Sequence, residues 1–172
     1  MKITALITVF TAMLLVGCAN SNSLSRKVQT LAVQSGTTKP TVIIAPIKAT
    51  EFTAAAARQT TFVETELRNS TADSLGNFGR FSSPQGRTSD ATLVFESIRH
   101  GVTQIGSTQY APTIEAVVRI VGANGKTLAS RKQSATSGEL HSLQDYVNNS
   151  ALYRDAIAIA VKKLSMEIAS GL

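Results

Sequence analysis

A mostly apolar segment at residues 41–47 predicts the first strand of the domain. Its four consecutive apolar residues, Val42-Ile43-Ile44-Ala45, favour burial on both faces, which predicts a strand in the interior of a sheet. Pro46 has no N–H to donate to a neighbouring strand, so this strand is predicted to end there.

Alternation of apolar and polar residues predicts three further strands, at residues 91–105, 113–121 and 127–136. In the first of these, alternation places Val94 and Ile98 on the same face, and Gly101 allows a bulge or bend. Asn124-Gly125 accepts the positive φ of hairpin turns, so the strand at 127–136 is predicted to return beside the strand at 113–121. Its polar character suits a solvated or edge position.

Two segments have the apolar period of helices. Residues 62–78 follow a short helical stretch at 54–57, and residues 143–169 contain no proline or glycine and predict one continuous helix. The apolar arc of this last helix covers about 220°, wider than the roughly 100° stripe of a helix that packs on one surface. The excess is explained either by cover within the monomer or by a protein–protein interface at Leu152, Ala156, Ile159 and Met166.

The element order β-α-β-β-β-α predicts an α+β fold. Both helices can pack on one face of a mostly antiparallel sheet of about four strands, which gives a two-layer sandwich. Residues 40–172 are long enough for this single domain. Residues 18–39 are rich in Ser, Asn, Gln and Thr, which predicts a flexible tether.

Residues 1–17 have the character of a secretory signal peptide. Their apolar run, 3–16, is shorter than the roughly 20 residues of a membrane-spanning helix. Leu15-Val16-Gly17-Cys18 resembles a bacterial lipobox. This resemblance implies cleavage before Cys18, acyl chains on the thiol of Cys18 and on its new amino group, and anchoring in a membrane. Ala19, where aspartate would resemble an inner-membrane retention signal, implies the outer membrane, with the domain facing the periplasm.

Composition argues against several classes of function. Cys18 is the single cysteine, so a disulfide framework and a cysteine metal site are excluded. The net charge of +6 becomes +5 without Lys2. The sequence contains no dense basic patch, so it does not predict nucleic-acid binding. His100 and His141 stand apart from other ligand residues and do not form a metal signature. No nucleophile elbow, phosphate loop or dinucleotide motif is present, so we expect no cofactor and no enzymatic activity.

Two segments resemble a group of small periplasmic domains that includes the N-terminal domain of TolB, the periplasmic domain of CsgG and the lipoprotein PelC. They are the run 41–47, an apolar strand ending in proline and isoleucine, and the closing helical segment 151–168. The resemblance extends over residues 40–169 in element order and implies an accessory of an envelope machine, often as a ring of copies. It carries over no catalytic residue, and the chain lacks the aromatic-plus-asparagine pattern that often follows the first strand.

Together these features predict a non-enzymatic outer-membrane lipoprotein. It would associate as a homo-oligomer or with proteins of an envelope complex for secretion, pilus assembly, polysaccharide export or a motor. The sequence leaves one alternative open, a periplasmic carrier of a small ligand or lipid, which would need an enclosed apolar cavity between sheet and helices.

Overall fold

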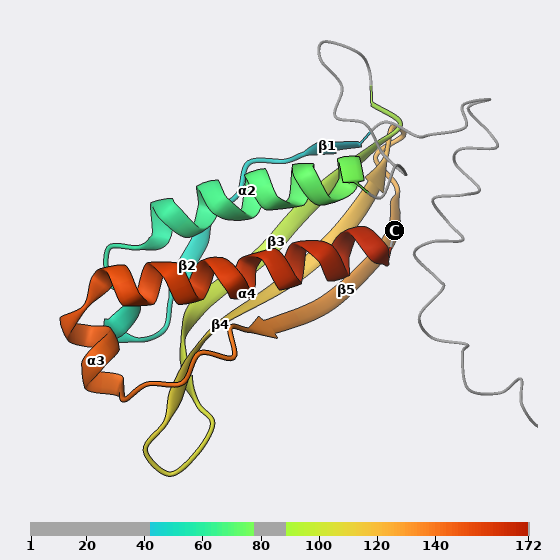
Figure 1. Ribbon diagram of the computed structural model, residues 1–172. Helices are drawn as coiled ribbons and strands as arrows, with labels where there is room; N and C mark the ends of the chain where they lie inside the picture. Colours follow the sequence, from blue (N-terminus) through green and yellow to red (C-terminus); the bar gives the residue numbers. More distant parts are fainter. Residues whose placement is uncertain (1–41, 78–88, 172) are drawn as a thin grey trace, which may run out of the picture.

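The computed structural model describes residues 42–77 and 89–171 (Figure 1). The predicted signal peptide, the predicted lipidation site Cys18 and the predicted tether lie outside these residues. The elements in chain order are β1 (Val42–Ile44), β2 (Ala49–Glu51), η1 (Ala54–Ala56), α2 (Thr60–Asn77), β3 (Ala91–Gln104), β4 (Tyr110–Gly122), β5 (Thr127–Thr136), α3 (Leu143–Asn148) and α4 (Ser150–Ser170).

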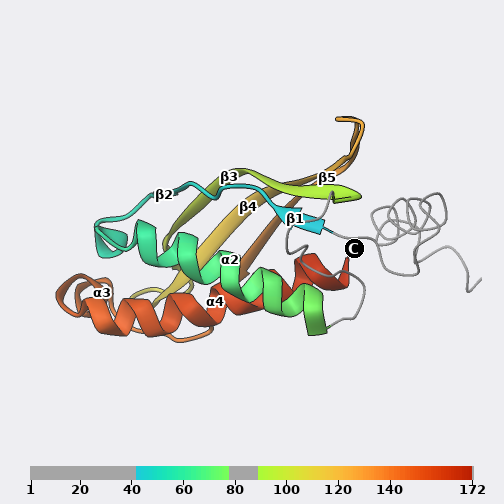
Figure 2. The ribbon, with the colours of Figure 1, turned by 90° about the horizontal axis from the view of Figure 1, so that it is seen from above.

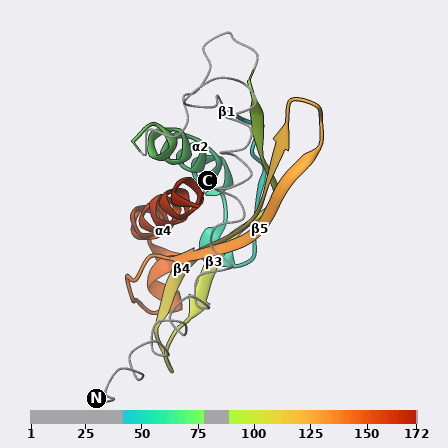
Figure 3. The same ribbon diagram turned by 90° about the vertical axis from the view of Figure 1, so that its right-hand side faces the viewer.

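The predicted α+β fold with two layers is confirmed. The strands form one five-stranded sheet in the order β1-β3-β4-β5, with β2 pairing to β3 beyond β1. β1 and β2 are parallel to β3, and the other pairs are antiparallel. α2 and α4 lie side by side on one face of this sheet, as the view from above and the end-on view show (Figures 2 and 3). The opposite face carries no helix from the described part of the chain (Figure 3).

The position predicted for the first strand is wrong. Among the described strands, β1 pairs with β3 alone and is therefore an edge strand, and the side chain of Ile43 is exposed on the helix-free face. The chain leaves β3 after Ala45, whose N–H donates to Leu93 O at 2.9 Å, and pairs with β3 again only from Ala49. Pro46 ends the first strand, as predicted, because it cannot donate to this ladder.

A bulge in β3 lies earlier than the sequence predicts. The register against β4 shifts between Phe95 and Ser97, not at Gly101. One inserted residue reverses the alternation, so Phe95 and Ile98 are both buried on the core side, and Val94 does not share a face with Ile98. The bulge explains why strict alternation gave the wrong face for the second half of this strand.

The predicted final helix is broken at Asn149. α3 ends at Asn148, and the side chain of Asn149 accepts a hydrogen bond from Leu152 N at 3.1 Å, which caps the start of α4. Asparagine offers the backbone this alternative bond, so it favours a helix terminus over a helix interior. A capping box between Ser142 and Asp145 fixes the start of α3.

The broad apolar arc of α4 is covered largely within the monomer. Its inner side chains, such as Ile157 and Leu164, are fully buried. α2 lies against its side, where Thr71 and Ser165 hydrogen-bond through their hydroxyl groups at 3.1 Å in the buried layer. Toward the surface, the guanidinium of Arg154 lies 4.4 Å from the centre of the Phe62 ring, a cation–π contact between the helices.

Gly101 predicts a measurable packing constraint. A Cβ at this position would lie 2.7 Å from Phe52 Cε2 and 2.9 Å from Thr53 Oγ1. We expect Gly101→Ala to lower the free energy of unfolding by about 1–3 kcal/mol in urea titrations, because the aromatic ring must move. Gly76→Ala, with nothing within 4 Å of the new Cβ, is the matched control and should leave stability unchanged or slightly raised. Equal stability of the two variants would contradict the close approach of Phe52 to Gly101.

Candidate interaction surfaces

The four residues of the predicted interface differ in how far the structure buries them. Ala156 is buried inside the monomer, and Leu152 packs partly against the core. Ile159 is half-buried, and Met166 is 55% exposed. Leu152, Ile159 and Met166 are spaced by seven residues and therefore follow one side of α4. We refer to these three residues as the α4 flank.

The α4 flank adjoins the free edge of the sheet. Lys163, one helical turn from Ile159, donates from Nζ to Thr136 O at 3.1 Å and to Ser137 O at 2.9 Å at the end of β5. Among the described strands, β5 pairs only with β4, so no described strand occupies its other edge. An apolar helix stripe beside an unpaired strand edge is a surface on which another chain can pack.

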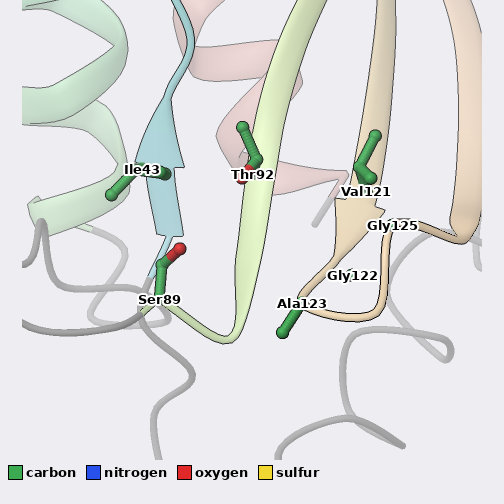
Figure 4. A pocket seen from close by; sticks show the side chains of 7 residues that line it. All are labelled: Ile43, Ser89, Thr92, Val121, Gly122, Ala123 and Gly125. Atoms are coloured by element: carbon green, nitrogen blue, oxygen red, sulfur yellow. The ribbon is translucent and has the colours of Figure 1, made fainter.

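The helix-free face of the sheet carries half-buried valines and threonines among charged pairs. Arg119 Nε lies 3.0 Å from Glu96 Oε1, and Lys132 Nζ lies 3.8 Å from Glu115 Oε2. An open hollow of about 530 Å³ lies at one end of this face, where β1, β3 and the β4–β5 turn meet (Figure 4). Its lining consists of Ile43, Ser89, Thr92, Val121, Gly122, Ala123 and Gly125. Among the described residues, this lining contains no paired acid, base or nucleophile.

A polar network crosses the interior at the other end of the sheet. His100 on β3 is fully buried, and its Nδ1 lies 2.9 Å from the hydroxyl oxygen of Tyr153 on α4. Its Nε2 lies 3.4 Å from Thr60 Oγ1, which donates to Glu51 Oε2 at 2.7 Å. One neutral tautomer of His100 satisfies every hydrogen bond of this network: Tyr153 donates to Nδ1, and Nε2–H donates to Thr60. The network joins β2, α2, β3 and α4.

Burial determines the protonation states in this network. Desolvation lowers the pKa of His100 below its ordinary value, although the carboxylates of Glu51 and Glu64 oppose the shift. Burial also raises the pKa of Tyr153, with a further contribution from Glu51. Both groups are therefore neutral near pH 7. Because His100 is closed off from solvent, the network stabilises the fold and does not present a catalytic base.

Sequence reasoning missed a second group of exposed apolar side chains. Four of them lie at one end of the domain, on the β3–β4 turn, the segment before α3, and α3 itself: Ile105, Leu140, Leu143 and Val147. The signal that could have identified them is large apolar residues within otherwise polar connecting segments.

Two other kinds of site are absent from the described part of the chain. Residues 42–77 and 89–171 contain no cluster of three or more His, Cys, Asp or Glu side chains placed to bind a metal ion. None of their helices is both long and apolar enough to cross a membrane.

Comparisons with known proteins define the fold of the chain. No family model matches it, and no curated protein matches its sequence. The structure is similar to that of protein XCC0632 from Xanthomonas campestris, of family model DUF330, with a TM-score of 0.52 and 15% identity over 76% of this chain and 82% of that one. A minor lipoprotein from Acinetobacter baumannii is similar with a TM-score of 0.51 and 12% identity, over 77% of this chain and 87% of that one.

A third similar structure is a Helicobacter pylori protein described as a candidate homolog of a neuraminyllactose-binding hemagglutinin. Its TM-score is 0.54 at 11% identity, over 78% of this chain and 83% of that one. Identities this low show a shared fold and nothing about shared activity. A PelC dodecamer from Paraburkholderia phytofirmans reaches a TM-score of only 0.42, so the resemblance to the TolB, CsgG and PelC group stays a prediction.

The buried histidine predicts a pH dependence of stability. The pKa of His100 is lowered in the folded state, whereas the unfolded chain has the ordinary value of 6.5. The unfolded state therefore binds the proton first, and the free energy of unfolding should fall as the pH drops below about 6.5. Urea titrations between pH 7.5 and pH 5 measure this effect.

Three variants test whether the effect comes from the network. His100→Gln should remove most of the pH dependence in this range, whereas His141→Gln, on a half-buried histidine, should retain it. Tyr153→Phe should cost about 1–3 kcal/mol at pH 7.5, because it leaves Nδ1 of His100 buried without its partner. A wild-type stability that does not change with pH over this range would contradict the assignment.

Proposed function

We propose that this chain is a lipid-anchored protein of a bacterial envelope that acts as a non-enzymatic assembly component. The observation that carries the proposal is the combination of an N-terminal apolar segment ending in Leu15-Val16-Gly17-Cys18 with a folded domain of a kind found in lipoproteins. Acyl chains on Cys18 would hold the chain in the outer membrane, with the domain in the periplasm. Each buried methylene contributes about 0.8 kcal/mol, and more than one chain gives a lasting anchor.

The distribution of charge supports a membrane-facing N-terminal segment. All 11 acidic residues of the chain lie within the described domain, whereas the residues between Cys18 and Val42 contain Arg26, Lys27 and Lys39 and no acidic residue. Each cation near an anionic membrane surface contributes about 1 kcal/mol of attraction. Behaving as a flexible coil, this segment would separate the anchor from β1 by roughly 25 Å.

Association through the α4 flank is the second part of the proposal. The flank combines exposed Met166 and half-buried Ile159 with the open edge of β5. Anchoring confines copies to a surface and raises their effective concentration, so even weak contacts become populated. The side chains of Leu67, Leu93 and Ile157 are buried between sheet and helices, where the alternative of a ligand carrier would need an enclosed apolar cavity.

Cys18→Ser tests the anchor in the full chain expressed in a Gram-negative host. We expect wild-type protein in the detergent-soluble membrane fraction, with an acylated N-terminal peptide starting at Cys18 by mass spectrometry. The variant should lose the acyl mass and move out of the outer-membrane fraction, because the thiol that carries lipid is gone. An unmodified wild-type Cys18 would refute the anchor and leave the association proposal intact.

Ile159→Asp combined with Met166→Asp tests the α4 flank. A carboxylate on an apolar contact surface is costly to desolvate, so the double variant should weaken association at least tenfold in sedimentation velocity of the detergent-solubilised chain. Thr61→Asp with Thr65→Asp adds the same charge to exposed positions of α2 and is the matched control. Thermal unfolding checks that both variants fold. Two results together would exclude this flank as an interface: a strictly monomeric wild-type chain, and a double aspartate variant that retains every partner of the wild type.

A further inference from the structure

We propose that the end of the domain formed by the β3–β4 turn, residues 139–142 and α3 docks a protein partner whose contact surface is apolar with lysine or arginine at its rim. We call this surface the apolar end. It is separate from the α4 flank and does not depend on lipid attachment. Its large apolar side chains are unusually exposed: Ile105 55%, Leu140 41%, Leu143 39% and Val147 46%.

The fold places these residues at the same end of the domain from three segments. Tyr110 and His141 exchange two backbone hydrogen bonds, of 2.8 and 3.1 Å, which extend the sheet by one bridge and place Leu140 beside the base of the β3–β4 turn. Leu143 and Val147 are four residues apart on α3 and therefore share one helix face. Ile105 lies on the turn itself, where its N–H donates to Gln109 O at 2.9 Å.

The supporting structure beneath the apolar end is fixed. Tyr146 of α3 is fully buried and donates to Glu139 O at 2.8 Å. Its ring meets those of His141 and Tyr153 edge-on, at 5.4 and 6.3 Å between centroids. The side-chain amide of Gln104 donates to Gly106 O and Ser107 O, which holds the turn. A surface ordered before binding loses little entropy when a partner docks.

Charge identifies the chemistry of the partner. Residues 101–114 contain no charged side chain, and the charged side chains of residues 133–153 are the carboxylates of Glu139 and Asp145. Arg154 follows in the first turn of α4, where its guanidinium lies 4.4 Å from the centre of the Phe62 ring on α2. Lys163 reaches this end, but its ammonium group is bound to the carbonyls of Thr136 and Ser137, and Arg58 borders it after η1. Anionic lipid headgroups would therefore meet carboxylates with few available cations, whereas a basic rim on a protein would be attracted.

Size and position favour a larger partner over a second copy. Four side chains expose far less than the roughly 800 Å² per partner of a standard interface, so a symmetric contact between two such ends would be weak. A short helix face with two apolar anchors instead fits a groove on another protein. The apolar end lies opposite the point where the chain enters β1 (Figures 1 and 2), so an anchor at the N-terminus would leave it accessible.

Two synthetic peptides test the proposal against the full-length chain in detergent. Both are amphipathic helices with the same leucine face, one with a lysine rim and one with a glutamate rim. We expect the lysine-rim peptide to bind at least tenfold more tightly by isothermal titration calorimetry. Leu143→Asp with Val147→Asp should weaken its binding at least tenfold. Ile105→Asp, on a different segment, should do the same and covers the case in which α3 fails to fold.

Matched controls separate the parts of the inference. Thr61→Asp with Thr65→Asp should leave peptide binding unchanged, and Glu139→Lys, which balances the charge of Asp145, should abolish the preference for the lysine rim. Equal binding of both peptides, or binding that ignores the aspartate variants, would overturn the proposal. Variant-sensitive binding to vesicles with anionic lipid would assign the surface to a membrane, and variant-sensitive self-association would assign it to a second copy; either result would also overturn it. None of these outcomes depends on whether Cys18 carries lipid.

Discussion

The covering of α4 is the constraint on which the architecture depends. This helix has too wide an apolar surface to be buried by a sheet alone, so α2 must lie against it on the same face. The two helices approach through Thr71 and Ser165, whose hydroxyl groups satisfy one another inside the layer. Because α2 protects only one side of α4, the other side, with Leu152, Ile159 and Met166, remains at the margin of the domain. The location of the α4 flank is therefore a consequence of how the core is completed.

The polar network at the base of α4 orders the end of the domain where the chain turns back. His100 on β3 and Tyr153 on α4 fix the first turns of the helix, and Tyr153 in turn contacts the ring of Tyr146 on α3. A buried network of this kind is useful only when every member finds a partner, and a single neutral tautomer of His100 achieves that here. The same contacts hold α3 in place. The exposed apolar residues of that end therefore rest on a supporting structure that resists rearrangement.

The sequence predicted the positions of helices and strands along the chain better than their neighbours in the fold. Strong alternation located β4 and its core residues such as Ile114 and Ile120, and Asn124-Gly125 identified the hairpin, where Gly125 has a φ of +75°. The errors arise where a local feature changes the phase or the neighbours of a segment. The bulge after Phe95 inverted the alternation in β3, and the apolar run from Val42 resembles an inner strand although β1 lies at the edge. Long-range pairing decides both, and no local pattern contains it.

The surfaces were harder to predict than the core, for a physical reason. A helical wheel shows that α4 is broadly apolar but not which side α2 will cover, so Ala156 was grouped with residues that remain partly open. The exposed residues Leu140 and Val147 lie in a connecting segment and a six-residue helix, where no period distinguishes a core face from a solvent face. Their significance depends on the bridge between Tyr110 and His141, which joins segments about 30 positions apart in the chain.

The uneven distribution of charge along the chain favours one orientation of the proposed anchored protein. The described domain contains equal numbers of acidic and basic residues, so the positive excess of the chain lies outside it, largely before β1. In the proposed anchored state, electrostatic attraction to the membrane would act on the N-terminal segment and hardly on the domain itself. Because the domain has no net charge, electrostatic attraction to the headgroups would not fix its orientation at the membrane. Its apolar end, with few available cations, would not be attracted to an anionic bilayer. An anchored chain of this design would present that end to partners in the space beyond the membrane.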